Sequence, residues 1–195
     1  ARSSRTLMLE NSLRQALDKG QLELVYQPQV SLANGELLGL EALLRWRHPD
    51  LGMVSPTEFI PLAETSGQIL RMGEWVMHTA ARQLKTWLDQ GMPPVTMAVN
   101  LSAIQFRDPG LVATVARVLH ETGLPPTCLL TSTRVPSSGR NSSWMTSPFL
   151  ASPASFRLVL SVPIWVLNAA SWASVWLSRR PSFRALAKVS ASTLR

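Results

Sequence analysis

The chain has 195 residues, of which 46% are apolar, so it can bury a core and is neither wholly disordered nor collagen-like. Its one cysteine excludes a disulfide scaffold and a cysteine-rich zinc site, and it fits a reducing compartment. Residues 131–195 hold 8 Lys/Arg and no acidic residue, whereas residues 1–130 hold 11 Lys/Arg and all 12 acidic residues. The net charge of +7, which alone would suggest nucleic acid or an anionic membrane, therefore comes from the last third.

The N-terminal segment predicts a helix followed by a β-hairpin. Residues 7–19 carry leucines at helical spacing. Residues 22–31 alternate as a strand does, and Pro28 fits an edge strand or a strand end because proline cannot donate a ladder hydrogen bond. An Asn-Gly pair at 34–35 then favours a tight turn into a second strand at residues 36–47.

Helices and short apolar strands alternate in the next part of the chain. Ser55 is the predicted N-cap of a helix that begins at Pro56. The remaining predicted elements are a helix at 68–90, a strand at 95–101 buried on both faces, a helix at 108–122 capped by Asp108, and a strand at 128–130. This order favours an α/β architecture with a parallel sheet. A (β/α)8 barrel needs about 250 residues, so residues 13–130 supply about half of one.

Four polar residues lie on or beside predicted strands: Gln27, Glu41, Arg45 and Asn100. Mg2+ and Mn2+ prefer oxygen ligands, which a Glu41 carboxylate and an Asn100 carbonyl can supply. Arg45 can clamp a phosphate with two hydrogen bonds, and Gln27 can bind a base or a phosphate oxygen. This set suits a metal-assisted phosphoryl site. The alternative is that Glu41 and Arg45 share one face of a strand and only pair with each other.

Four motifs resemble those of the EAL domain family. They are YQP at 26–28, EALLRW at 41–46, PTEFIPLAE at 56–64 and VNLS at 99–102. Their order and separations are those of the family over about residues 13–130. The resemblance implies a (β/α)8 TIM-type barrel, incomplete here, with its N-terminal half at 13–130. Residues 1–12 then begin a linker helix that could follow a GGDEF domain, and the tail after about residue 130 is expected to be irregular or disordered.

The resemblance also implies a function, the hydrolysis of the bacterial second messenger cyclic di-GMP to linear pGpG with Mg2+ or Mn2+. Glu41 and Asn100 match the family's metal ligands, and Gln27, Leu43 and Arg45 match residues that line its nucleotide site. In the implied two-metal mechanism, metal ions lower the pKa of a bound water and neutralise the leaving oxygen. No further catalytic residue can be assigned.

The later motifs of the family are absent. An acidic E-x-T-E motif is expected near Leu129, followed by DDFGTG and a K-I-D strand, but no acidic residue follows Glu121. We therefore expect hydrolysis by this chain to be impaired. The alternatives are a non-catalytic cyclic di-GMP-binding or regulatory remnant, and a fragment without function. A half barrel leaves strand edges unpaired, so we expect residues 1–130 alone to be poorly stable.

The basic tail, residues 131–195, is rich in Ser, Pro and Trp. Its composition changes where the motifs end, which a frameshift near Leu130 would produce; a genuine tail is the alternative. Residues 158–178 carry no charge, so membrane contact through them is a minor alternative. The expected partners are cyclic di-GMP, an upstream GGDEF or sensor domain and a second copy of the chain, with no nucleic-acid polymer. The expected location of the domain is the cytoplasm.

Overall fold

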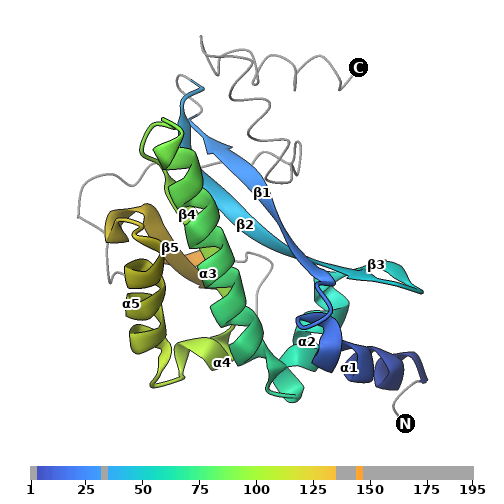
Figure 1. Cartoon of the computed structure of the whole chain (residues 1–195). Coiled ribbons are helices and arrows are strands. Elements are labelled where there is room, and N and C mark those ends of the chain that lie inside the picture. The colour runs from blue at the N-terminus through green and yellow to red at the C-terminus, as the bar shows by residue number, and fades with distance from the viewer. Residues whose placement is uncertain (1–3, 32–34, 135–143, 147–195) are drawn as a thin grey trace, which may run out of the picture.

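The computed structural model describes residues 4–31, 35–134 and 144–146 (Figure 1). In chain order the elements are α1 (Ser4–Ala16), β1 (Leu22–Val30), β2 (Leu37–His48), β3 (Gly52–Val54), α2 (Pro56–Thr65), α3 (Gln68–Asp89), β4 (Thr96–Leu101), α4 (Ala103–Phe106), α5 (Leu111–Thr122), the 3-10 turn η1 (Pro126–Cys128), β5 (Leu129–Arg134) and β6 (Trp144–Thr146).

The strands form one mixed sheet in the order β1-β2-β4-β5-β6, with β3 paired to β2. The hairpin strands β1 and β2 are antiparallel, while β2, β4 and β5 are parallel to one another. The predicted α/β architecture with a parallel sheet is therefore confirmed. Pro28 lies on β1, which is an edge strand as predicted. At the hairpin turn Gly35 has a φ of 72°, which favours glycine, whereas Asn34 lies outside the described residues.

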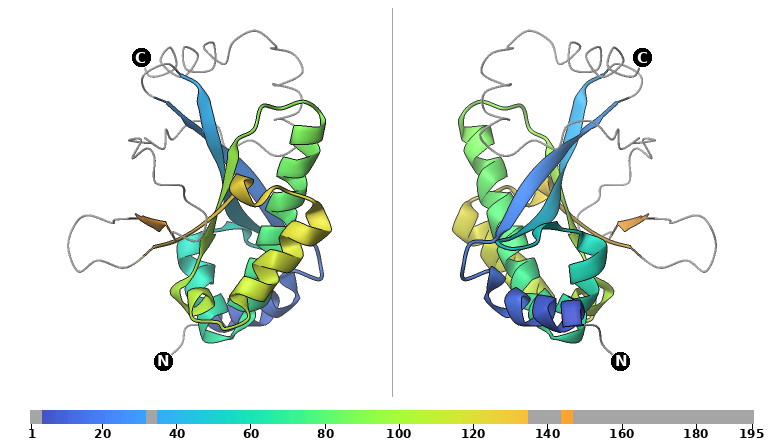
Figure 2. Two further views of the ribbon diagram at one scale, coloured as in Figure 1. Left: turned by 90° about the vertical axis from the view of Figure 1, so that its left-hand side faces the viewer. Right: turned by 90° about the vertical axis from the view of Figure 1, so that its right-hand side faces the viewer.

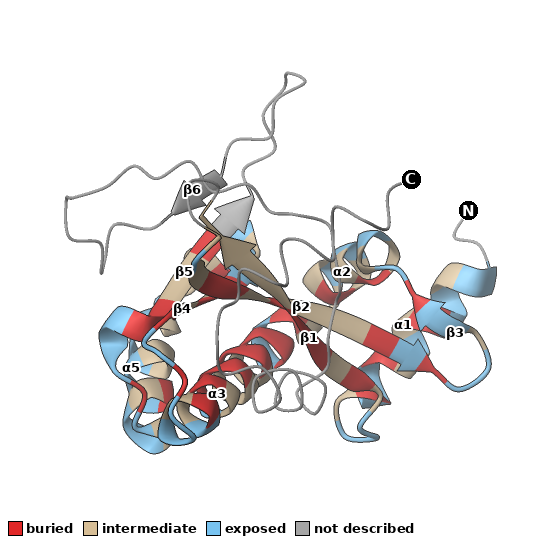
Figure 3. Ribbon diagram, turned by 90° about the horizontal axis from the view of Figure 1, so that it is seen from above, coloured by how far each residue is buried: buried red, intermediate tan, exposed pale blue. Residues whose placement is uncertain are grey.

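Helices α3 and α5 lie on the same side of the sheet (Figure 2). The main core joins α3 to the sheet, with Leu40, Ala42, Met97 and Val99 pointing from the strands toward it. A second cluster around Trp46 and Phe59 joins α1 and α2 to one end of the hairpin. Buried residues consequently follow the inner surfaces of α3 and the strands (Figure 3). The face turned away from α3 and α5 carries the alternate strand residues.

The start of α5 and the burial of β4 differ from their predictions, and α1 lies three residues earlier than predicted. Helix α5 begins at Leu111 rather than at 108, because the Asp108 carboxylate accepts a hydrogen bond from the Gly110 N–H at 3.1 Å and forms a turn before the helix. Strand β4 is buried on one face only: Thr96 and Ala98 are half-buried, and Asn100 is exposed. The apolar run predicted two buried faces, but in the described part of the chain no helix covers the second one.

The region predicted as an irregular tail contains regular structure at its start. Strand β5 continues past residue 130 to Arg134, and β6 pairs with it in antiparallel fashion. Residues 147–195, which include 158–178, lie outside the described residues. Among the helices that the structure does describe, none has the length and apolar character needed to cross a bilayer.

Helix α2 shows its predicted start, with Ser55 as N-cap and Pro56 as first residue. The Ser55 hydroxyl accepts from the Thr57 N–H, while the Glu58 carboxylate accepts two hydrogen bonds from Arg5 of α1, at 2.6 and 3.1 Å. The Glu58 side chain therefore forms an ion pair that joins the two helices.

This ion pair predicts a pH dependence. The hydrogen bond from Arg5 lowers the pKa of Glu58, so the pair stabilises the fold above the ordinary pKa of glutamate and this contribution is lost as the pH falls through the lowered value. We expect the denaturation midpoint of Glu58→Gln to lie slightly below that of the wild type at pH 7, and the two to converge as the pH falls through the lowered pKa of Glu58. A difference that persists unchanged in acid would contradict this origin.

Gly39 of β2 lies directly beside Thr96 of β4. A Cβ at Gly39 would meet the Thr96 side-chain oxygen at 2.6 Å and its backbone oxygen at 2.9 Å, and the backbone cannot move without disturbing the sheet. We expect Gly39→Ala to lower the free energy of unfolding by about 1–3 kcal/mol in urea denaturation. Adding Thr96→Ala should restore only part of the loss, because the backbone contact remains. An unchanged midpoint for the single variant would refute the argument.

Candidate functional site

All five predicted site residues lie on the face of the sheet that is turned away from α3 and α5. Gln27 lies directly opposite Glu41 across the β1/β2 pair, and Leu43 and Arg45 follow Glu41 at alternate positions of β2. Asn100 lies two residues beyond Ala98, the neighbour of Glu41 on β4. Strand alternation therefore sets these residues on the face opposite the core residues Leu40, Ala42, Met97 and Val99.

Glu41, Asn100 and Ser132 form a chain of hydrogen bonds across three strands. The Asn100 Nδ2 donates to Glu41 Oε1 at 2.7 Å, and the Ser132 hydroxyl donates to Asn100 Oδ1 at 2.9 Å. Asn100 and Ser132 are neighbours in the parallel β4/β5 register. Asn100 is exposed, whereas Ser132 is buried. We call these three residues the polar trio.

Arg45 does not pair with Glu41. Four residues along a strand separate their Cα atoms by about 13 Å, and among the described residues no ion pair joins them. Arg45 Nη1 donates instead to the Leu44 carbonyl at 3.0 Å. Glu23, which faces Arg45 across the hairpin, binds Arg47 at 3.1 Å. The alternative in which Glu41 and Arg45 only neutralise each other is therefore wrong, and the remaining Arg45 donors are available for a ligand.

The polar trio fits a divalent cation poorly. Glu41 is its one carboxylate, and the Asn100 carbonyl oxygen already accepts the Ser132 hydroxyl. All Asp, Glu, His and Cys residues of the chain fall within the described part, and no three of them gather into a possible metal site. Mg2+ and Mn2+ sites need several oxygen ligands, so the described residues do not supply the ligand set for a pair of metal ions.

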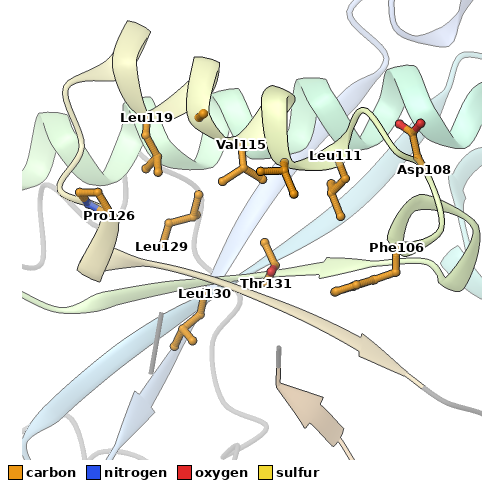
Figure 4. A pocket seen from close by; sticks show the side chains of 11 residues that line it. Phe106, Asp108, Leu111, Val115, Leu119, Pro126, Leu129, Leu130 and Thr131 are labelled. Carbon is orange, nitrogen blue, oxygen red and sulfur yellow. The ribbon is translucent and has the colours of Figure 1, made fainter. Parts of the chain in front are cut away.

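A separate pocket of about 360 Å³ lies between α5 and β5, on the other side of the sheet (Figure 4). Leu111, Val115, Leu119 and Leu129 make its lining largely apolar, and Asp108 is the one charged residue among the described residues that line it. Leu129 points toward α5, whereas Leu130 points away from it (Figure 4). In a (β/α)8 barrel helices pack side by side around the strands, so this groove suits helix packing rather than chemistry.

A family model described as EAL domain matches residues 10–142, more than half of the chain. The chain belongs to the EAL domain family. The family match extends past residue 130 to residue 142, a region that lacks the later acidic motifs of the family. The predicted family and its incomplete TIM-type barrel are thereby confirmed.

Several EAL proteins are similar to this chain. MucR of Pseudomonas aeruginosa, a bifunctional diguanylate cyclase/cyclic di-GMP phosphodiesterase, is 48% identical over 130 residues, which are 67% of this chain and 19% of MucR. The oxygen sensor protein DosP of Escherichia coli is 45% identical over 118 residues, 60% of this chain and 15% of DosP. The chain thus spans about a fifth of the length of these relatives, or less.

Solved EAL structures share the fold of this chain. The MucR phosphodiesterase in complex with cyclic di-GMP aligns with a TM-score of 0.62 and 48% identity, over 64% of this chain and 50% of that one. The FimX EAL domain of Pseudomonas aeruginosa bound to cyclic di-GMP aligns with a TM-score of 0.56 and 27% identity, over 66% and 49%. This chain therefore corresponds to about half of an EAL barrel.

Sequence reasoning did not identify Ser132 as a member of the polar trio. The strand was predicted to end at residue 130, so Ser132 was assigned to the tail. A signal was available: Leu129, Leu130, Thr131 and Ser132 continue an extended pattern, and a parallel neighbour of β4 brings its second polar residue beside Asn100.

Proposed function

We propose that this chain is the N-terminal part of a cyclic di-GMP phosphodiesterase domain that retains a nucleotide-binding face and has lost metal-assisted hydrolysis to pGpG. The observation that carries the proposal is the gathering of Gln27, Leu43 and Arg45 on one face of the sheet beside the polar trio. Two similar EAL structures are complexes with cyclic di-GMP.

The chemistry of this face suits a cyclic dinucleotide. Arg45 offers a guanidinium for a phosphodiester oxygen. The Gln27 amide can donate and accept hydrogen bonds at a base edge, and Leu43 offers an apolar contact for a base between them. Glu41 repels phosphate, so we place the phosphate at Arg45 and a hydrogen-bond donor of the ligand at Glu41.

Hydrolysis needs more than this face provides. Metal ions would activate the attacking water and neutralise the leaving oxygen, and Glu41 with Asn100 would have to hold them. One carboxylate and one engaged amide do not make such a site. We therefore place Mg2+ or Mn2+ chemistry in a complete EAL domain rather than in this chain, whose own residues bind and orient the nucleotide.

Calorimetric titration of the full chain with cyclic di-GMP in EDTA tests the binding half of this proposal. We expect a saturable isotherm in EDTA that linear pGpG and GTP do not reproduce at equal concentration. The absence of heat at high nucleotide concentration would contradict the proposal and favour a fragment without function.

The remaining parts of the proposal concern the parent protein. We propose residues 13–130 as the portion that keeps the EAL motifs, residues 131–195 as a segment that lacks the later motifs, and a cytoplasmic location where cyclic di-GMP acts as a messenger. An upstream GGDEF or sensor domain joined through α1, and a homodimer, complete the proposal. Size-exclusion chromatography with light scattering tests the dimer directly.

A further inference from the structure

The polar trio has a fixed direction of hydrogen bonding. An ionised carboxylate only accepts hydrogen bonds, so the Asn100 group that faces Glu41 at 2.7 Å must be the NH2. The carbonyl oxygen then necessarily faces Ser132, whose hydroxyl donates to it at 2.9 Å. Both ends of the Asn100 amide are thus engaged by neighbouring strands.

This direction opposes metal binding. A cation held by Glu41 and Asn100 needs the carbonyl oxygen of Asn100, but the amide presents N–H groups toward Glu41. Turning the amide by half a rotation would break the bond to Glu41, where two acceptor oxygens would then face each other, and would require the Ser132 hydroxyl to accept a hydrogen bond instead of donating one. The hydrogen bonds of Asn100 to charged Glu41 and to buried Ser132 each stabilise the observed orientation of the amide.

We propose that Ser132 is the positioning residue that holds the Asn100 NH2, rather than its carbonyl oxygen, toward Glu41. In this orientation the polar trio binds a hydrogen-bond donor instead of a divalent cation. The inference shares its site with the proposed nucleotide-binding face, but it concerns the protein without nucleotide. Its failure and the failure of the nucleotide proposal can therefore be told apart.

The test is Mn2+ titration of the 15N-labelled full chain, observed through the side-chain amide signals of Asn100. These signals are assigned by their loss in Asn100→Asp. The variants are Ser132→Ala, which removes the hydroxyl, and Ser132→Asp, which adds a carboxylate. Thr131→Ala is the matched control, because its side chain lines the pocket on the opposite side of β5.

In the wild type and in Thr131→Ala we expect two well-separated Asn100 amide signals that Mn2+ leaves sharp. In Ser132→Ala the signals should shift, because the amide loses the hydrogen bond to its carbonyl oxygen and keeps only the one to Glu41. In Ser132→Asp, Mn2+ should broaden them at a concentration at least tenfold lower than in the wild type, and adding Glu41→Gln should abolish the effect.

Two outcomes would overturn the inference. One is broadening of the wild-type signals at the same Mn2+ concentration as in Ser132→Asp. The other is that the Asn100 amide signals of Ser132→Ala equal those of the wild type. This second outcome can be judged without Mn2+ and without the Ser132→Asp variant.

Discussion

Replacing Arg45 by alanine is expected to weaken the binding of cyclic di-GMP about ten- to a hundredfold. Arg45 donates one hydrogen bond to the Leu44 carbonyl and has no ion-pair partner among the residues that the structure describes. A hydrogen bond from a charged donor to phosphate contributes about 1.5–3 kcal/mol, which corresponds to that range. Calorimetric titration of wild type and variant in EDTA measures the loss.

The matched control is Arg82→Ala. Arg82 lies on α3, the helix on the opposite side of the sheet, and its side chain contacts His78. The substitution therefore removes the same charge without changing the proposed nucleotide-binding face. We expect this control to bind as the wild type does. Equal weakening in both variants would mean that net charge, not a contact to Arg45, governs affinity.

Replacing Trp46 by alanine is expected to have the largest effect on stability. Trp46 is fully buried, packs edge-on against Phe59 and His48 with ring centroids 5.7 and 5.5 Å away, and donates to the Gln21 side chain at 3.2 Å. A buried tryptophan lost to alanine costs about 3–5 kcal/mol. The free energy of unfolding of a whole domain is only about 5–15 kcal/mol, so we expect that of a half barrel to be small.

We therefore expect urea denaturation of Trp46→Ala to show a strongly lowered midpoint or no cooperative transition at all. Trp46→Phe should keep most of the packing and lose the bond to Gln21. Met53→Ala, at a half-exposed position of β3, should stay within about 0.5 kcal/mol of the wild type. A midpoint for Trp46→Ala that equals that of Met53→Ala would refute the role of this cluster.

Local signals predicted most of the fold correctly. The leucine spacing of α1, the alternation of β1 and the long apolar stripe of α3 each fix a period, and the period selects helix or strand. The errors arose where tertiary contacts decide. Thr96, Ala98 and Asn100 belong to an apolar run, yet which face is covered depends on neighbouring helices. Asp108 was predicted to cap α5, but its carboxylate instead accepts a hydrogen bond within a turn that precedes this helix.

The site was less accessible to sequence reasoning than the fold. The positions of Glu41 and Asn100 followed from the family motifs, and the structure brings their side chains into contact. The distance that separates Arg45 from Glu41 follows from strand rise alone. Ser132, in contrast, becomes relevant only through the β4/β5 register, which no periodicity in the sequence specifies. The roles of Gln27, Leu43 and Arg45 stay predictions until binding is measured.

The central claim, binding without hydrolysis, is tested most directly by equilibrium dialysis of labelled cyclic di-GMP against the full chain. The dialysis is run in Mn2+ and in EDTA, and the nucleotide in each chamber is identified by chromatography. We predict excess label on the protein side in both buffers, all of it intact cyclic di-GMP. Accumulation of pGpG in Mn2+ that Glu41→Gln abolishes, or no excess label in either buffer, would contradict the claim.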